Sequence, residues 1–218
     1  KELFDLLSNN INDRRREFLG IALHTMMVGA TFEETFEKFQ NSPECKMSEV
    51  QRQELLEMLS LSKLYERFVE FKFKIRFSDK NPLDTDKIAL KDMAEDGNRE
   101  NKKKMKILAL NSLLSDSTLE ILLMETEIKK LNTYKNDIIE KGDGVGIVNR
   151  IVDGKPQFIH RTFAEYFVAM FFVENFKKDK KQSQTIIKYF LENIINRENA
   201  VICDFVDSKL NDEAFKHN

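Results

Sequence analysis

The chain has 218 residues, enough for one large domain or two small ones. Hydrophobic residues make up 41% and charged residues 33%, which is typical of a helix-rich fold with a substantial core. The formal net charge of -2 disfavours a globally basic nucleic-acid binder. Seven glycines and three prolines provide little of the turn chemistry that an all-β fold needs.

The two cysteines, Cys45 and Cys203, fit no metal-binding spacing and form no Cys-x-x-Cys motif, so two free thiols in a reducing compartment are expected. No signal peptide opens the chain, and the longest apolar run, Phe167–Val173, is far too short to span a membrane. We therefore expect a cytoplasmic protein with no membrane partner. The chain begins at Lys1 within a helical pattern, which predicts a fragment of a longer protein.

Three helices are predicted in the first 60 residues. The first covers 13–29, with Gly29 as its C-cap. The others cover 31–39 and 48–59, and each begins with a capping box of Ser or Thr followed three residues later by Glu or Gln. A loop over 41–46 separates the last two.

The next segment, Leu64–Phe77, fits two patterns. Residues 71–77 alternate between apolar and charged side chains, as in a strand. Leu64, Phe68, Phe71 and Ile75 also form a helical stripe. Because the run continues without a break from a helical beginning, we favour a helix.

The middle of the chain is predicted to be helical, apart from a turn over 81–86. The charged stretch 95–104 is expected to be a solvated loop or helix face. Apolar periodicity predicts the remaining helices of this part over 88–93, 105–114, 119–124 and 128–139.

The pattern then changes at three glycines spaced Gly-x-Gly-x-Gly over 142–146, which is typical of a flexible linker. Residues 147–159 predict a β-hairpin with a tight Asp153-Gly154 turn, and Pro156 indicates an edge strand. A broad-faced helix follows, for which we predict Thr162 as N-cap and Glu165 as its capping-box partner. Further helices are expected over 186–195 and 200–206.

These elements predict a mainly α fold: a helical bundle, then a winged helix with a short β-hairpin, then more helices. The predicted domains are a first helical domain over 1–78, a winged-helix domain over 79–176 and the start of a second helical domain over 177–218.

Few side chains here suit covalent chemistry. The histidines His24, His160 and His217 have no metal-type partner three or four residues further along the chain, and no serine or cysteine has a nucleophile's sequence setting. The three glycines precede a hairpin and not a long helix, so they are not a P-loop. We therefore predict no catalytic residue and no metal site in this chain.

His160 and Arg161 are the strongest candidate ligand-binding residues. They precede a helix whose first amide N–H groups lack partners within the helix, and such a terminus favours anions. A neutral imidazole there has a ring N–H to donate to an anion, and a guanidinium suits phosphate. The structural alternative is that His160 finishes a strand and bonds to a backbone carbonyl.

The segment from Phe158 to Ala169 resembles a conserved block of the NACHT nucleotide-binding proteins, of the signal-transducing (STAND) NTPase and NOD-like receptor class. That block reads Phe-Leu-His-x-(Ser/Thr)-Phe-x-Glu-(Tyr/Phe)-Phe-Ala-Ala. The matching positions are Phe158, His160, Thr162, Phe163, Glu165, Tyr166, Phe167 and Ala169. Two shorter segments are similar to other NACHT motifs, in the same order: 18–23 to a Gly-x-Pro-Leu motif and 64–68 to a Leu-Tyr-x-x-Phe helix. Insect members, which often carry ankyrin repeats downstream, are the most similar in character.

The resemblance implies an ATP/ADP switch that controls conformational opening and oligomerisation, as in innate immune-type signalling. His160, with Arg161 beside it, would sense the nucleotide phosphate, and Gly20, Ala22 and Leu23 would line the adenine side. The resemblance also implies ADP or ATP with magnesium in the full-length protein, an upstream P-loop domain, a downstream ankyrin or leucine-rich repeat domain, and self-association on activation.

The sequence departs from the family at two points. Ala22 stands where the family has proline, which removes a rigid apolar ring from the adenine side. No P-loop sequence Gly-x-x-x-x-Gly-Lys-(Ser/Thr) occurs in the chain, so the fragment alone is not an ATPase, although the full-length protein would be a slow one.

Two other functions remain open. One is a helical protein-interaction scaffold that no longer uses nucleotide. The other is a winged-helix nucleic-acid binder, which is disfavoured by the net charge and by Glu165 and Glu174 on the helix after the hairpin.

Overall fold

The computed structural model describes residues 26–27, 29–30, 60–80, 88–178 and 181–214. The chain divides into two compact units, Lys1–Phe71 and Lys72–Asn218. The described residues are mainly helical with one small two-stranded sheet, which confirms the predicted fold class. The three-domain division stays a prediction.

In the first unit, the predicted helices over 31–39 and 48–59 and most of the helix over 13–29 lie outside the described residues. Gly29 and Ala30 are both helical, and the φ angle of Gly29 is not in the left-handed range. The prediction that Gly29 is the C-cap of the first helix is therefore wrong, because a glycine cap would have ended the helix there with a positive φ.

Helix α5, Leu61–Lys80, resolves the ambiguous segment as a helix. Leu64, Tyr65, Phe68 and Phe73 are buried, whereas Ile75 is 41% exposed. The alternation over 71–77 therefore does not mark a strand. The predicted helical stripe also ends earlier than expected, since Ile75 leaves the buried face.

In the second unit, helix α6, Ile88–Leu113, is a single helix that includes the charged stretch 95–104. Arg99 pairs with Asp96 one turn earlier, and the two side chains are exposed. Residues from Met105 to Leu110 are mostly buried. The helix is thus solvated in its middle and enters the core in its last two turns.

Two shorter helices follow, α7 (Asp116–Leu122) and α8 (Glu125–Lys141). The Ser115 hydroxyl caps α7 by accepting the Thr118 N–H at 3.3 Å. The Glu127 carboxylate accepts the Met124 N–H at 3.1 Å at the start of α8. These two contacts place the helix starts three residues earlier than apolar periodicity alone predicts.

Strands β1 (Val148–Val152) and β2 (Lys155–Phe158) form the predicted antiparallel hairpin. Asp153 and Gly154 both have positive φ, as a two-residue hairpin turn requires. The Lys155 ammonium contacts the Leu114 carbonyl and the Asp116 carboxylate, each at 3.0 Å. A cation from the hairpin thus satisfies a free carbonyl just after the end of α6.

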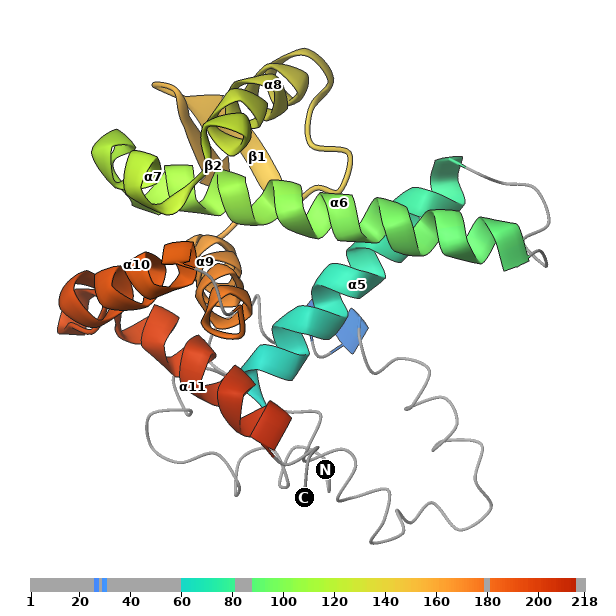
Figure 1. The fold of residues 1–218 in the computed structure, drawn as a ribbon. Coiled ribbons are helices and arrows are strands. Elements are labelled where there is room, and N and C mark those ends of the chain that lie inside the picture. Colours follow the sequence, from blue (N-terminus) through green and yellow to red (C-terminus); the bar gives the residue numbers. More distant parts are fainter. Residues whose placement is uncertain (1–25, 28, 31–59, 81–87, 179–180, 215–218) are drawn as a thin grey trace, which may run out of the picture. The chain divides into compact units, whose positions relative to one another are not determined.

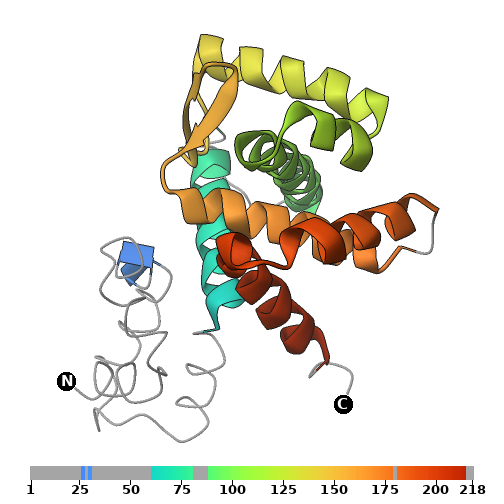
Figure 2. The same cartoon turned by 90° about the vertical axis from the view of Figure 1, so that its left-hand side faces the viewer.

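Helix α9 (Arg161–Phe176) is the central element of this unit, and it packs against α6 on one side and α11 (Ala200–Ala214) on another (Figures 1 and 2). In both views α6 lies between α8 and α9. Helix α10 (Lys181–Tyr189) continues into a π-helical turn, Phe190–Ile194, and a short 3₁₀ helix, Arg197–Asn199, precedes α11. Helices, then the hairpin, then α9 follow one another as predicted, although the predicted helices over 88–93 and 105–114 are one helix, α6. The assignment of this part as a winged helix stays a prediction.

Candidate functional site

The candidate site lies where the hairpin passes into α9. The Ile159 N–H donates to the Ile147 carbonyl at 3.0 Å, which extends the strand pairing beyond β2. His160 keeps an extended backbone, with φ -147° and ψ 141°, and α9 begins at Arg161. His160 is therefore the last extended residue and the N-cap of the central helix.

The His160 ring itself forms the cap. Its Nδ1 accepts the Thr162 backbone N–H at 3.3 Å and lies 2.7 Å from the Thr162 hydroxyl. Because an N–H donates to Nδ1, that nitrogen carries a lone pair and the ring proton resides on Nε2. Among the described residues, Nε2 has no hydrogen-bond partner. The local contacts thus leave one imidazole N–H donor available at the start of α9.

The predicted capping box is wrong. Thr162 lies inside the helix, and its hydroxyl contacts the His160 ring. Glu165 accepts from Arg161 Nε at 2.9 Å and does not reach back to an N-cap amide. The reason is that strand pairing at Ile159 holds the chain extended only as far as His160, so helical geometry begins two residues before the predicted position.

Arg161 and Glu165 form an ion pair with unequal exposure. The Arg161 side chain is 69% exposed, whereas that of Glu165 is 8% exposed. The carboxylate offsets part of the Arg161 charge at the helix start. Only Nε is engaged, however, so the two terminal guanidinium nitrogens have no hydrogen-bond partner within the part of the chain that the structure describes.

The aromatic residues of the motif belong to the core. Phe163, Tyr166 and Phe167 are buried. The Phe158 and Phe167 rings lie 6.3 Å apart between centroids, which joins β2 to α9. The Tyr166 ring meets the Phe205 ring edge-on at 5.4 Å, which joins α9 to α11. These contacts hold the helix that follows His160 in place.

The predicted adenine side stays a prediction. Gly20, Ala22 and Leu23 lie outside the described residues. In the second supporting motif, Leu64, Tyr65 and Phe68 are buried in α5.

Asp143 has a role in the glycine segment over 142–146 that was not predicted from the sequence. One Asp143 carboxylate oxygen accepts the Ile147 and Val148 N–H groups at 2.9 and 2.8 Å. The other accepts the Val145 N–H at 3.4 Å. Gly142 and Gly146 have positive φ and allow the chain to turn around this carboxylate. The segment is therefore a loop held by side-chain hydrogen bonds and not the predicted flexible linker. An aspartate followed by a glycine-rich turn is the sequence signal that could have indicated this structure.

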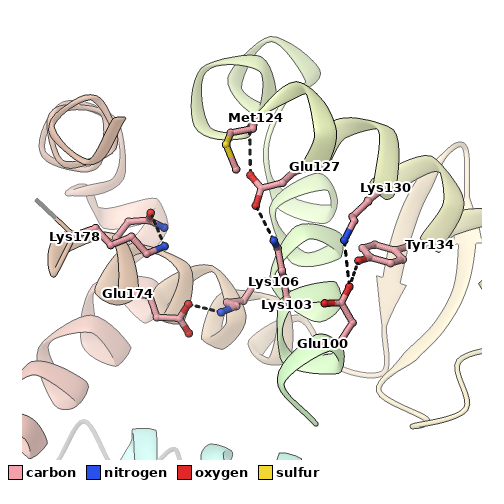
Figure 3. Close-up of polar contacts among 10 residues, drawn as sticks. Glu100, Lys103, Lys106, Met124, Glu127, Lys130, Tyr134, Glu174 and Lys178 are labelled. Carbon is pink, nitrogen blue, oxygen red and sulfur yellow. Dashed lines mark hydrogen bonds and ion pairs between the residues drawn. The ribbon is translucent and has the colours of Figure 1, made fainter. Parts of the chain in front are cut away.

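A polar network connects α6 to α8 and α9 (Figure 3). The Tyr134 hydroxyl donates to Glu100 at 2.8 Å, and Lys130 lies 3.6 Å from the same carboxylate. Glu127 pairs with Lys103 at 3.5 Å, and Lys106 pairs with Glu174 of α9. The Tyr134 hydrogen bond lowers the pKa of Glu100, whereas burial and Glu100 raise the pKa of Tyr134.

These shifts predict a pH-dependent contribution of Tyr134. Because the pKa of Glu100 is lowered in the fold, its contribution to stability is present above the ordinary carboxyl pKa and is lost as the pH falls. Because the pKa of Tyr134 is raised, its contribution is present below the ordinary phenol pKa and is lost as the pH rises. Tyr134→Phe should therefore cost up to about 1 kcal/mol between about pH 5 and 9, because exposure screens the bond. Urea unfolding at pH 7 and pH 3.5 measures this, and an equal cost at both values would contradict it.

Within the described residues, no group of three or more His, Cys, Asp or Glu side chains is arranged to hold a metal ion. In the same part of the chain, no helix combines the length and apolar character needed to cross a membrane. No known protein-family profile matches the sequence, and searches of curated proteins and of solved structures also find no match.

Proposed function

We propose that this chain is the regulatory part of a NACHT-type ATP/ADP switch, with His160 as the residue that senses the nucleotide phosphate. The observation that supports the proposal is the state of the His160 ring. Its Nδ1 is engaged by Thr162, so its Nε2–H is left to donate at the start of α9. The exposed Arg161 guanidinium stands next to it in the chain. A donor and a cation at a helix N-terminus suit a phosphate oxygen.

A single hydrogen bond from His160 contributes too little free energy to hold a nucleotide by itself. One charge-assisted hydrogen bond contributes about 1.5–3 kcal/mol. Micromolar affinity requires about 8 kcal/mol. The proposal therefore includes an upstream P-loop domain that holds ADP or ATP with magnesium, while His160 adds a contact that favours the closed state. A downstream repeat domain, self-association on activation and a cytoplasmic location belong to the same proposal.

Paired substitutions of His160 test the sensor. In the complete protein, His160→Asn keeps an acceptor for the Thr162 N–H, because asparagine is a good N-cap, but it lacks the distant donor. We expect ADP to dissociate about ten to a hundred times faster from this variant. His160→Gln places an amide N–H near the position of Nε2 and should restore part of the retention. Stopped-flow release of a fluorescent ADP analogue measures both.

His160→Ala serves as the control for folding. Losing the cap should cost about 1 kcal/mol of stability, whereas His160→Asn should cost little. Equal ADP release rates in wild type and His160→Asn would eliminate the sensor role, even if the stabilities follow the expected order.

A second candidate is a helical interaction scaffold that no longer uses nucleotide. It is favoured by exposed apolar side chains, including Ile121 and Met124 near the end of α7 and Leu191 and Ile195 beyond α10. Ala22 in place of the family proline also favours it. This candidate predicts that the intact protein copurifies without ADP and does not change its oligomeric state with ATP. Two measurements distinguish the functions. Mass spectrometry detects any ADP released when the purified protein is denatured, and size-exclusion chromatography with and without ATP reports the oligomeric state.

A further inference from the structure

Arg76 and Lys104, two cations with no role in the proposed switch, lie near the glycine segment over 142–146. We call them the Arg76–Lys104 pair. The Arg76 guanidinium, near the end of α5, donates to the Asn101 side-chain oxygen of α6 at 3.4 Å. The same guanidinium lies against Gly144, where an added Cβ would stand 3.1 Å from its Cζ and Nε. Glycine at 144 thus permits the close approach of the guanidinium to the loop backbone.

Lys104 shares a face of α6 with Asn101, because the two residues are three positions apart in the helix. Its ammonium lies 5.6 Å from the centroid of the Tyr134 ring. Burial lowers the pKa of Lys104, the charges of Asp143 and Asp137 oppose that effect, and the charge of Arg76 adds to it. The two cations therefore interact with each other in a partly desolvated place.

Neither cation has a carboxylate within ion-pair distance among the described residues. The two nearby acids are engaged elsewhere. Asp143 accepts three amide N–H groups of its own loop, and Asp137 lies 3.6 Å from Lys141. Unpaired charges away from full solvation are costly, so an anion between them would relieve both their mutual repulsion and their desolvation.

We propose that the Arg76–Lys104 pair binds a phosphate group. Arg76 Nη1 has a second N–H beside the one directed at Asn101, and Nη2 has two, so the guanidinium retains donors for phosphate oxygens, while Lys104 supplies a point charge. The backbone N–H of Gly144 has no partner among the described residues and is a further donor in the adjoining loop. The pair shares no residue with the His160 site, so the inference does not depend on the proposed function.

The test is thermal unfolding of the 218-residue chain with inorganic phosphate against chloride at equal ionic strength. We expect about 20 mM phosphate to raise the wild-type midpoint by about 4 °C. Lys104→Met and Arg76→Met should abolish that shift. Lys129→Met is the matched control, since it removes one charge from an exposed position on α8, and it should keep the shift.

The state of Lys104→Met without phosphate gives an independent readout. Its midpoint should equal or exceed that of wild type, because the substitution removes a half-buried charge that has no carboxylate partner. In wild type, the Gly144 amide resonance should shift saturably with phosphate in a heteronuclear NMR titration.

Two outcomes would overturn the proposal. The same midpoint shift in all variants would mean that phosphate acts only by exclusion from the protein surface. If His160→Asn loses the shift and Lys104→Met keeps it, phosphate binds at His160 and not at the Arg76–Lys104 pair, and the result favours the proposed function. Retention in His160→Asn and loss in Lys104→Met supports the Arg76–Lys104 pair whether or not His160 senses nucleotide.

Discussion

Phe172→Ala is expected to lower the free energy of unfolding by about 3–5 kcal/mol, the largest effect of any single change considered for this chain. The Phe172 side chain is fully buried in α9. Its ring lies 4.9 Å from that of Phe190 and 6.3 Å from that of Phe176. Removing it leaves a cavity between α9 and the π-helical turn. Urea denaturation followed by circular dichroism measures the loss.

Two control variants separate the loss of core packing from the removal of any apolar side chain. Phe172→Leu keeps most of the volume and should cost much less than alanine. Leu191→Ala removes a side chain that is 59% exposed in the same π-helical turn and should change stability by less than about 0.5 kcal/mol. A similar loss for Leu191→Ala and Phe172→Ala would show that the aromatic cluster is not the core of this unit.

Asp143→Ala should be the most destabilising polar substitution, at about 2–4 kcal/mol. The change removes the acceptor of three loop N–H groups, and Val145, Ile147 and Val148, which carry those groups, are themselves buried. A buried N–H left without a partner costs about 1–3 kcal/mol. We expect reduced protection of the Ile147 and Val148 amides in hydrogen exchange, together with a lower unfolding midpoint.

Asp143→Asn separates the hydrogen bonds from the charge. One oxygen accepts both the Ile147 and Val148 N–H groups, and the asparagine oxygen is able to take that position. The loss should therefore be about half of that for alanine or less. If asparagine and alanine destabilise the chain equally, the negative charge near Lys104 matters more than the hydrogen bonds.

Periodicity predicted the mainly helical fold and the hairpin, because burial and turn chemistry are local signals. The Asp153-Gly154 turn was correct because both positions require positive φ and few residue pairs accept it. Helix ends were less accurate. Charged residues at 95–104 continue α6, since such residues are good helix formers that pair with one another along the helix.

The candidate site shows why other features could not be predicted from the sequence. Thr162 and Glu165 have the spacing of a capping box, but strand pairing at Ile159 fixes where helical geometry begins. That contact joins residues 147 and 159, and a local pattern does not contain it. The same limit applies to the Arg76–Lys104 pair, whose members come from different helices, and to the ring proton of His160, which depends on a bond to Thr162.

The burial of α9 has a mechanical consequence. Nearly every residue from Phe163 to Val173 is inside the protein, in contact with α6 on one side and α11 on another. We expect such a helix to move as one piece from Phe163 onward, because its buried side chains hold it on two sides. A displacement of the His160 end of α9 is therefore expected to shift α6 and α11, the helices that pack against it.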